Sequence, residues 1–294
     1  MSKKTIITLV LVFLAVFIVF GTVTNMIIFN SGAKGLNLRS GLKGEYFEVD
    51  DKKTIDLDGV EVVNISVVSS DVNLYEVSGD MDVSLKMKGV STGEKVKLIV
   101  DEMGSTVNIK VEYPRFNVRL NVQSSILDIS LPSDYEGQIN INSVSGDVSS
   151  NGAFSSSLVG LDIGTTSGDV DFANNSVAEF DAKSVSGDVS LESSITKSSR
   201  VSTTSGDIDI SNIADGCEDV YAKSVSGGVM IDYDKACRTE IRTVSGDIEL
   251  SVSGNQAIDL DYSSTSGDMS GNVNMNDAGA VFKVSSTSGD LRFR

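Results

Sequence analysis

From residue 44 onward, apolar and polar residues alternate over most of the chain, the pattern expected of strands that bury one face. The alternation is clearest around a Ser-Gly-Asp tripeptide that recurs between residues 145 and 290, where the glycines, one imperfect copy included, follow one another at intervals of 19 to 22 residues. The glycine and aspartate of the complete copies are Gly146 and Asp147, Gly168 and Asp169, Gly187 and Asp188, Gly206 and Asp207, Gly246 and Asp247, Gly267 and Asp268, and Gly289 and Asp290. In an eighth copy, Gly227 is followed by Gly228 and the aspartate is missing.

Aligning the copies on this glycine shows where the apolar positions lie. Five residues before it stand Ile141, Ile163, Ala182, Val201, Ala222, Ile241, Tyr262 and Val284. Two residues after it stand Val148, Val170, Val189, Ile208, Val229, Ile248, Met269 and Leu291. Each copy therefore predicts two short strands that flank a bend, followed by a variable connector.

A unit of this size cannot bury its own apolar face, so the copies are expected to stack, each on the next, around one continuous core. Equivalent strands would then run parallel, about 4.8 Å apart. The sequence thus predicts an all-β fold, a parallel β-solenoid resembling a β-helix with rungs of about 20 residues, over residues 133–294. A β-propeller fits less well because each of its blades needs about 40 residues.

The bend itself has a simple physical interpretation. Glycine allows a positive φ or a close approach of two backbones, and the aspartate can accept hydrogen bonds from nearby amides in an Asx-type turn. Three residues before each glycine the side chain is always Ser or Thr, which could form hydrogen bonds along the stack. Calcium between stacked aspartates is conceivable, but binding by local amides is favoured, because calcium needs six or more oxygen ligands. We therefore expect no metal site, no cofactor and no catalytic residues.

Before the regular repeat, residues 44–132 have a less regular pattern that is still typical of strands. Within them, Ser69-Ser70-Asp71-Val72 resembles a degenerate copy of the bend. We expect this stretch to form degenerate rungs and a cap, since the end of a solenoid needs covering. Residues 34–43 are expected to form a short stalk.

The segment from Thr5 to Ala33 contains no charged residue and is long enough to span a bilayer. Residues 1–33 are therefore expected to form an N-terminal transmembrane anchor; a cleaved signal peptide is the alternative. The numbers of lysines and arginines before and after this segment are nearly equal, so the positive-inside rule gives little preference for either orientation in the membrane. We expect a single-pass protein of the cell membrane, with its C-terminal domain outside.

Composition narrows the chemistry. The chain has no histidine, which removes the commonest general base and a common metal ligand. Its net charge of −17 is expected to repel nucleic acid, so no nucleic-acid partner is predicted.

Only two cysteines are present, Cys217 and Cys237, and both fall in connectors one repeat apart. Stacked positions about 4.8 Å apart lie within the range of a disulfide. We predict a disulfide between them, which agrees with an exported domain.

The repeat segments resemble those of a family of bacterial adhesin-like domains built from β-strand repeats. The likeness rests on Leu131-Pro132-Ser133-Asp134 before the first copy, on the serial SVSGDV and TTSGDI segments, and on the last copy, Thr287 to Phe293. It covers about residues 45–294. The resemblance implies a solenoid behind a membrane anchor, an association with envelope stress systems in some members, and no catalytic residues. Gly228 departs from the pattern.

Two functions are therefore compared. The first is a membrane-anchored interaction module of the cell envelope, adhesin-like or a scaffold, whose partner is an envelope glycan or another envelope protein. The alternative is a carbohydrate-active β-helix enzyme of the lyase or hydrolase type, which would need a cluster of acidic groups together with Arg or Lys in a groove. A catalytic site should break the symmetry of the repeat, and the only clear break is the loss of an aspartate at Gly228.

Overall fold

A computed structural model describes residues 45–93, 96–114, 120–151, 158–175, 177–192, 195–213 and 216–294. These residues form strands and no helix, so the expected all-β fold is confirmed. Residues 44–294 make up one compact unit. The predicted anchor (residues 1–33) and the predicted stalk (residues 34–43) both lie outside the described residues. Within the described residues, no helix is long and apolar enough to cross a membrane.

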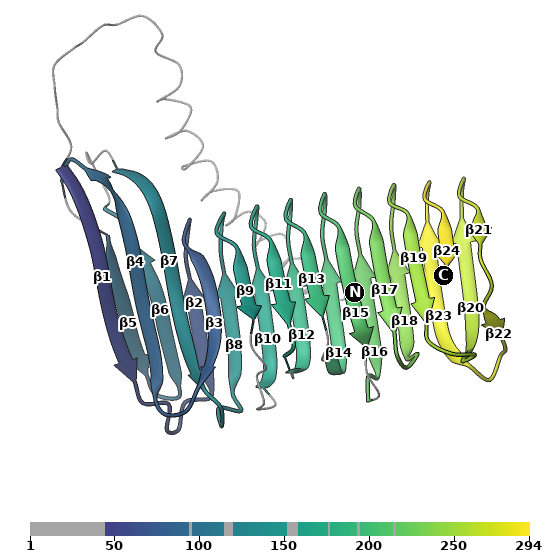
Figure 1. Cartoon of the computed structure of the whole chain (residues 1–294), viewed down its shortest axis with the longest axis horizontal. Coiled ribbons are helices and arrows are strands. Elements are labelled where there is room, and N and C mark those ends of the chain that lie inside the picture. Colours follow the sequence, from purple (N-terminus) through teal and green to yellow (C-terminus); the bar gives the residue numbers. More distant parts are fainter. Residues whose placement is uncertain are drawn as a thin grey trace, which may run out of the picture. The chain divides into compact units, whose positions relative to one another are not determined.

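The strands form two twelve-stranded sheets whose apolar faces enclose the core (Figure 1). In spatial order, sheet 1 contains β1 (Glu45–Ile55), β4 (Met81–Ser91), β7 (Leu120–Pro132), β3 (Asp71–Val77), β9 (Val148–Asn151), β11 (Val170–Ala173), β13 (Val189–Glu192), β15 (Ile208–Ile213), β17 (Val229–Tyr233), β19 (Ile248–Val252), β24 (Leu291–Phe293) and β21 (Met269–Ser270). Sheet 2 contains β22 (Asn274–Met275), β20 (Ala257–Ser264), β23 (Ala280–Ser286), β18 (Arg238–Arg242), β16 (Asp219–Lys223), β14 (Ile195–Ser202), β12 (Val177–Lys183), β10 (Leu158–Gly164), β8 (Gln138–Asn142), β2 (Val62–Ser66), β6 (Thr106–Glu112) and β5 (Lys97–Met103).

Each rung consists of one strand of sheet 2, the Ser-Gly-Asp bend, and one strand of sheet 1. The rungs stack in parallel, and equivalent residues face each other: Val148 pairs with Val170, which pairs with Val189. Because the register matches equivalent positions, the apolar rows read from the sequence point inward together, and Ile163, Ala182 and Val201 have no exposed surface.

The N-terminal end of the stack is covered by antiparallel strands. β4 lies antiparallel to β7, β1 lies antiparallel to β4, and β5 lies antiparallel to β6. Next to these antiparallel pairs, β6 lies parallel to β2, and β7 lies parallel to β3. Both β6 and β7 come later in the chain than the strands they pair with, yet they lie nearer the N-terminal end of the stack. Ser70 and Asp71 occupy the place of the bend in the rung formed by β2 and β3.

At the other end, the expectation that each copy stacks on the next is wrong. The last copy, β23 and β24, inserts between β18–β19 and the preceding copy, β20–β21. The two copies differ most in side-chain size four residues after the bend glycine. There the last copy carries Phe293, which is 5% exposed, whereas the displaced copy carries Gly271, which has no side chain to fill the core. The copy that fills the core better occupies the interior position.

Candidate functional site

The bend glycines are required by close approach of neighbouring rungs and not by a left-handed backbone. None of the eight has a positive φ. A Cβ atom on Gly187 would instead overlap the backbone carbonyl of Gly168, and the same clash recurs from rung to rung. The eight copies of the repeat therefore admit only glycine at this corner, while Ser70 takes the equivalent place in the rung of β2 and β3.

The Ser or Thr three residues earlier acts mainly within its own bend. The amide of Gly187 donates to Oγ of Ser184 at 2.7 Å, and the amide of Gly227 donates to Oγ of Ser224 at the same distance. Bonds from one rung to the next are fewer; one runs from Oγ1 of Thr243 to Oγ of Ser286 at 3.2 Å. The expectation of a hydroxyl ladder along the stack is therefore wrong for most copies. Seven of these eight side chains are buried and Ser264 is partly buried, and hydroxyls in these positions satisfy an amide that the sharp bend leaves unpaired.

The aspartates, in contrast, form their hydrogen bonds between rungs and not within one bend. Their carboxylates do not form the expected local Asx-type turn. Six of the seven accept the backbone amide of the equivalent residue in the adjacent rung, and the exception is Asp268, which lies in the last rung of the stack. The amide of Asp188 donates to Oδ1 of Asp169 at 2.9 Å, and the amide of Asp207 donates to Oδ1 of Asp188 at 2.8 Å. These bonds also hold neighbouring carboxylates apart in a fixed orientation.

Gly228 interrupts this aspartate ladder. Its amide donates to Oδ1 of Asp207 at 2.7 Å, but it offers no carboxylate to Asp247 in the following rung. A Cβ atom at position 228 would meet its nearest neighbours at 3.6 and 3.7 Å, which is ordinary contact. An aspartate would therefore fit at this position.

We expect the substitution Gly228→Asp to stabilise the domain by about 1 kcal/mol, because it completes the ladder and restricts the unfolded chain. Thermal unfolding at physiological salt measures the effect. Gly228→Ala is the matched control, since it restricts the unfolded chain without adding an acceptor. A Gly228→Asp protein no more stable than Gly228→Ala would show that the ladder bond contributes nothing.

The two outer faces differ in charge. From β9 to β19, sheet 1 and its bends carry no lysine or arginine. Their acidic residues are Asp147, Asp169, Asp171, Asp188, Glu192, Asp207, Asp209, Asp232, Asp247 and Glu249. Partial desolvation, together with the carboxylates of Asp232 and Glu192, raises the pKa of Asp209. Glu249 pairs with Arg294, which follows β24, but no basic residue of β9 to β19 or their bends neutralises the other carboxylates.

Sheet 2 neutralises its charges locally. Nζ of Lys183 lies 2.7 Å from a carboxylate oxygen of Asp181, and Arg242 pairs with Glu240 at 2.5 Å. The guanidinium of Arg200 lies over the ring of Tyr221, 5.9 Å from its centroid. From β10 to β18, sheet 2 is therefore a mixed face, whereas the charged residues of sheet 1 from β9 to β19 are all acidic.

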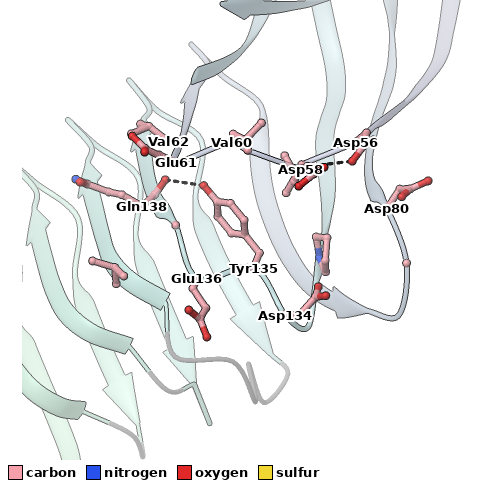
Figure 2. Close-up of a pocket in the computed structure, with 16 residues that line it drawn as sticks. Asp56, Asp58, Val60, Glu61, Val62, Asp80, Asp134, Tyr135, Glu136 and Gln138 are labelled. Atoms are coloured by element: carbon pink, nitrogen blue, oxygen red, sulfur yellow. Dashed lines mark hydrogen bonds between the residues drawn. The ribbon is translucent and has the colours of Figure 1, made fainter. Parts of the chain in front are cut away.

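A hollow of about 860 Å³ lies where the cap meets the first rungs, at the ends of the strands opposite the bends. Three connectors line it, namely the segments 56–61, 78–80 and 133–137 (Figure 2). The acidic residues around it are Asp56, Asp58, Glu61, Asp80, Asp134 and Glu136. No lysine, arginine or cysteine is among its lining residues.

Tyr135 forms the floor of this hollow and is almost fully buried. Its hydroxyl donates to the carbonyl of Gln138 at 3.3 Å, and burial raises its pKa to about 12. A phenol held in this way is not an acid or base at neutral pH. The hollow therefore provides carboxylates alone, and no described cluster of His, Cys, Asp or Glu is arranged to hold a metal ion.

The structure brings the two cysteines together. Cys217 precedes β16 and Cys237 precedes β18, and their sulfurs are 2.6 Å apart. Both are free thiols here, so the predicted disulfide is not formed in this structure and stays a prediction. The contact between them lowers the pKa of Cys217 and raises that of Cys237.

Comparison with known proteins adds the family context. The family model described as Toastrack DUF4097 matches residues 60–293. No curated protein matches the chain.

Similar solved structures are found at low sequence identity, and one of them has a TM-score above 0.5. A candidate adhesin from Bacteroides fragilis is 16% identical, with a TM-score of 0.51, over 85% of this chain and 97% of that one. A candidate adhesin from Parabacteroides distasonis is 10% identical, with a TM-score of 0.47, over 85% and 97%. A candidate lipid-binding protein from the same species is 13% identical, with a TM-score of 0.44, over 86% and 97%.

Proposed function

Starting from a chain that belongs to the Toastrack DUF4097 family, we propose that it is a non-catalytic interaction module of the bacterial cell envelope. In this proposal residues 1–33 anchor the chain in the membrane, and the β domain lies outside and contacts an envelope glycan or another envelope protein. The fold shared with the candidate adhesin from Bacteroides fragilis is compatible with this role.

One observation carries the proposal. The residues that make the repeat distinctive are used to hold the rungs together: glycines by close approach, hydroxyls by bonds within the bend, and aspartates by bonds between rungs. What the repeat leaves free is an extended acidic face on sheet 1. Such a surface suits binding along its length better than turnover at one point.

Capture of the detergent-solubilised full chain on isolated peptidoglycan and on other envelope glycans tests the binding role. A variant with Asp171→Lys and Asp209→Lys tests whether binding depends on the acidic face of sheet 1. The variant Lys183→Asp, which changes a charge on sheet 2, is the control. Binding that depends on sheet 1 supports the proposal. Release of sugar fragments by the purified protein would instead favour the second candidate.

That second candidate is a carbohydrate-active enzyme, and the acidic hollow is the observation that favours it. Glycoside hydrolysis uses two carboxylates that flank the scissile bond, and the hollow gathers six acidic residues from three connectors. If polysaccharide cleavage were found, it should be lost in a variant that combines Asp58→Asn with Asp134→Asn.

For topology, we expect protease added to intact protoplasts to cut after about residue 40 and to release the β domain, because the domain is proposed to lie outside. Immunoblotting with an antibody against the β domain measures this release. Lysed protoplasts provide the control in which every copy is accessible. Complete protection in intact protoplasts would place the domain inside the cell.

A further inference from the structure

The C-terminal end of the stack is less well covered than the N-terminal end. We call β20, β21 and β22, with the connectors between them (Ala257–Met275), the terminal rung. Its inward positions are partly open: Met269 is 37% exposed and Met275 is 54% exposed. Leu260 and Tyr262 are only partly buried. In the neighbouring rung, the equivalent core residues are closed to solvent.

The backbone of the terminal rung is open as well. One side of β20 pairs with β23 from Ile258 to Ser264. On its other side, β22 pairs only with Ala257 and Ile258. Among the described strands, none pairs with that side of β20 from Asp259 to Ser264, and the rung lies at the end of the stack (Figure 1). An unpaired edge of this kind is a template for another strand.

One buried polar group in the terminal rung is also unsatisfied. The hydroxyl oxygen of Tyr262 is shielded from solvent, yet no residue of the described structure forms a hydrogen bond with it. A buried hydroxyl without a partner costs free energy that a bound partner could recover. At the N-terminal end, β1 and β5 are also edge strands, but their inward residues Phe47, Ile55 and Leu98 are buried, in contrast to Met269 and Met275.

Charge indicates what kind of strand would fit. Residues 254–281 contain Asp259, Asp261, Asp268 and Asp277 but no lysine or arginine. The same end of a second copy would bring these acidic residues against each other, which is unfavourable. A basic partner is favoured for the same reason.

β23 shows the required pattern on the side of β20 that is already paired. There Leu260 lies opposite Phe282, Asp261 opposite Lys283, and Tyr262 opposite Val284. In a parallel stack, strands on the two sides of β20 have the same rows of inward and outward side chains. A strand on the open side should therefore show the same alternation of residues as β23. The pattern is apolar, basic, apolar.

We propose that the terminal rung is a docking site for an extended segment of a partner protein, in which apolar and basic residues alternate, and which pairs with the open edge of β20. The segment would extend sheet 2 by one strand, with main-chain hydrogen bonds supplying affinity and Asp259 and Asp261 selecting for basic residues. This inference rests on the interaction role proposed above and names one site for it.

A peptide with the sequence of residues 278–288 is a direct probe, because it carries the strand pattern that β20 already accepts. Fluorescence anisotropy of the labelled peptide is measured with the full-length protein in detergent micelles. We expect saturable binding that weakens roughly five- to ten-fold when the position of Lys283 in the peptide is glutamate, because a favourable cross-strand pair becomes a repulsive one. The protein variant Asp261→Lys should reverse this preference, so the glutamate peptide should then bind better.

Absence of saturable binding to the wild-type protein would overturn the proposal, and so would equal binding of the two peptides. Photo-crosslinking from the position of Phe282 in the peptide should label β20; labelling confined to the cap would also contradict it. Concentration-dependent self-association of the full chain that Asp261→Lys abolishes would assign the site to a second copy and overturn the proposed partner. Because Asp261 is far along the stack from the middle of the acidic face, glycan capture that persists in Asp261→Lys would separate failure here from failure of the proposed function.

Discussion

Replacing Gly187 with alanine should destabilise the β domain by about 3 kcal/mol or more, although the change adds a single methyl group. Gly187 lies in the middle of the stack, and its added Cβ would overlap the backbone carbonyl of Gly168. Neither backbone can move alone, because each is bonded to rungs on both sides. Thermal unfolding followed by circular dichroism should show the midpoint falling by roughly 6–12 °C.

Gly160→Ala is the matched control. Gly160 lies within β10, and a Cβ atom there would first meet the side chain of Gln138 at 3.6 Å, which is ordinary contact. Its stability should therefore change by less than about 1 kcal/mol. If the two variants unfolded at the same temperature, close approach of the rungs would not be the reason for glycine at the bend.

Oxidation of Cys217 and Cys237 to a disulfide should have the next largest effect, and it should stabilise the β domain. The two residues are 20 apart in the chain, and their sulfurs are already in contact. A bond between them would close a loop worth about 3 kcal/mol in the chain-entropy model. The thiol of Cys217, whose pKa is lowered, is the one that we expect to attack an external disulfide first. Reduction of the oxidised protein should lower its unfolding midpoint, while a variant with Cys217→Ser and Cys237→Ser should be indifferent to reductant.

The oxidation state in the native host decides whether the bond forms there. Protein from the host is alkylated without reduction and examined by mass spectrometry. Unmodified cysteines that become reactive after reduction would establish the disulfide and would agree with an exported domain. Two alkylated thiols before reduction would refute it.

Much of the central stack could be predicted from residues alone, because the relevant interactions are local or periodic. Alternation places Val170 and Phe172 on one face of a strand whatever its neighbours are, and both are buried. The recurrence of the bend then determines which strands are equivalent, and equivalent strands pair in parallel. The adjacency of Cys217 and Cys237 follows from the same reasoning.

The hollow at the base of the cap could not be predicted in this way. Asp58, Asp80 and Asp134 come from three connectors of the irregular region, and no repeat relates one connector to another. The available signal was the concentration of acidic residues in those connectors. Acidic connectors are also common simply because they are exposed to solvent, so the signal does not identify a site.

What the sequence by itself determined is the rung: its two strands, its inward rows and the need for glycine at its corner, since these depend on backbone geometry and on the period of the side chains. What only the tertiary structure decided is the order of rungs at the two ends and the partner of each aspartate. Near-identical repeats can pair in more than one order, so the choice depends on packing. Phe293 fills an interior position that Gly271 would leave empty, and this places the terminal rung, with its open edge, at the end of the stack.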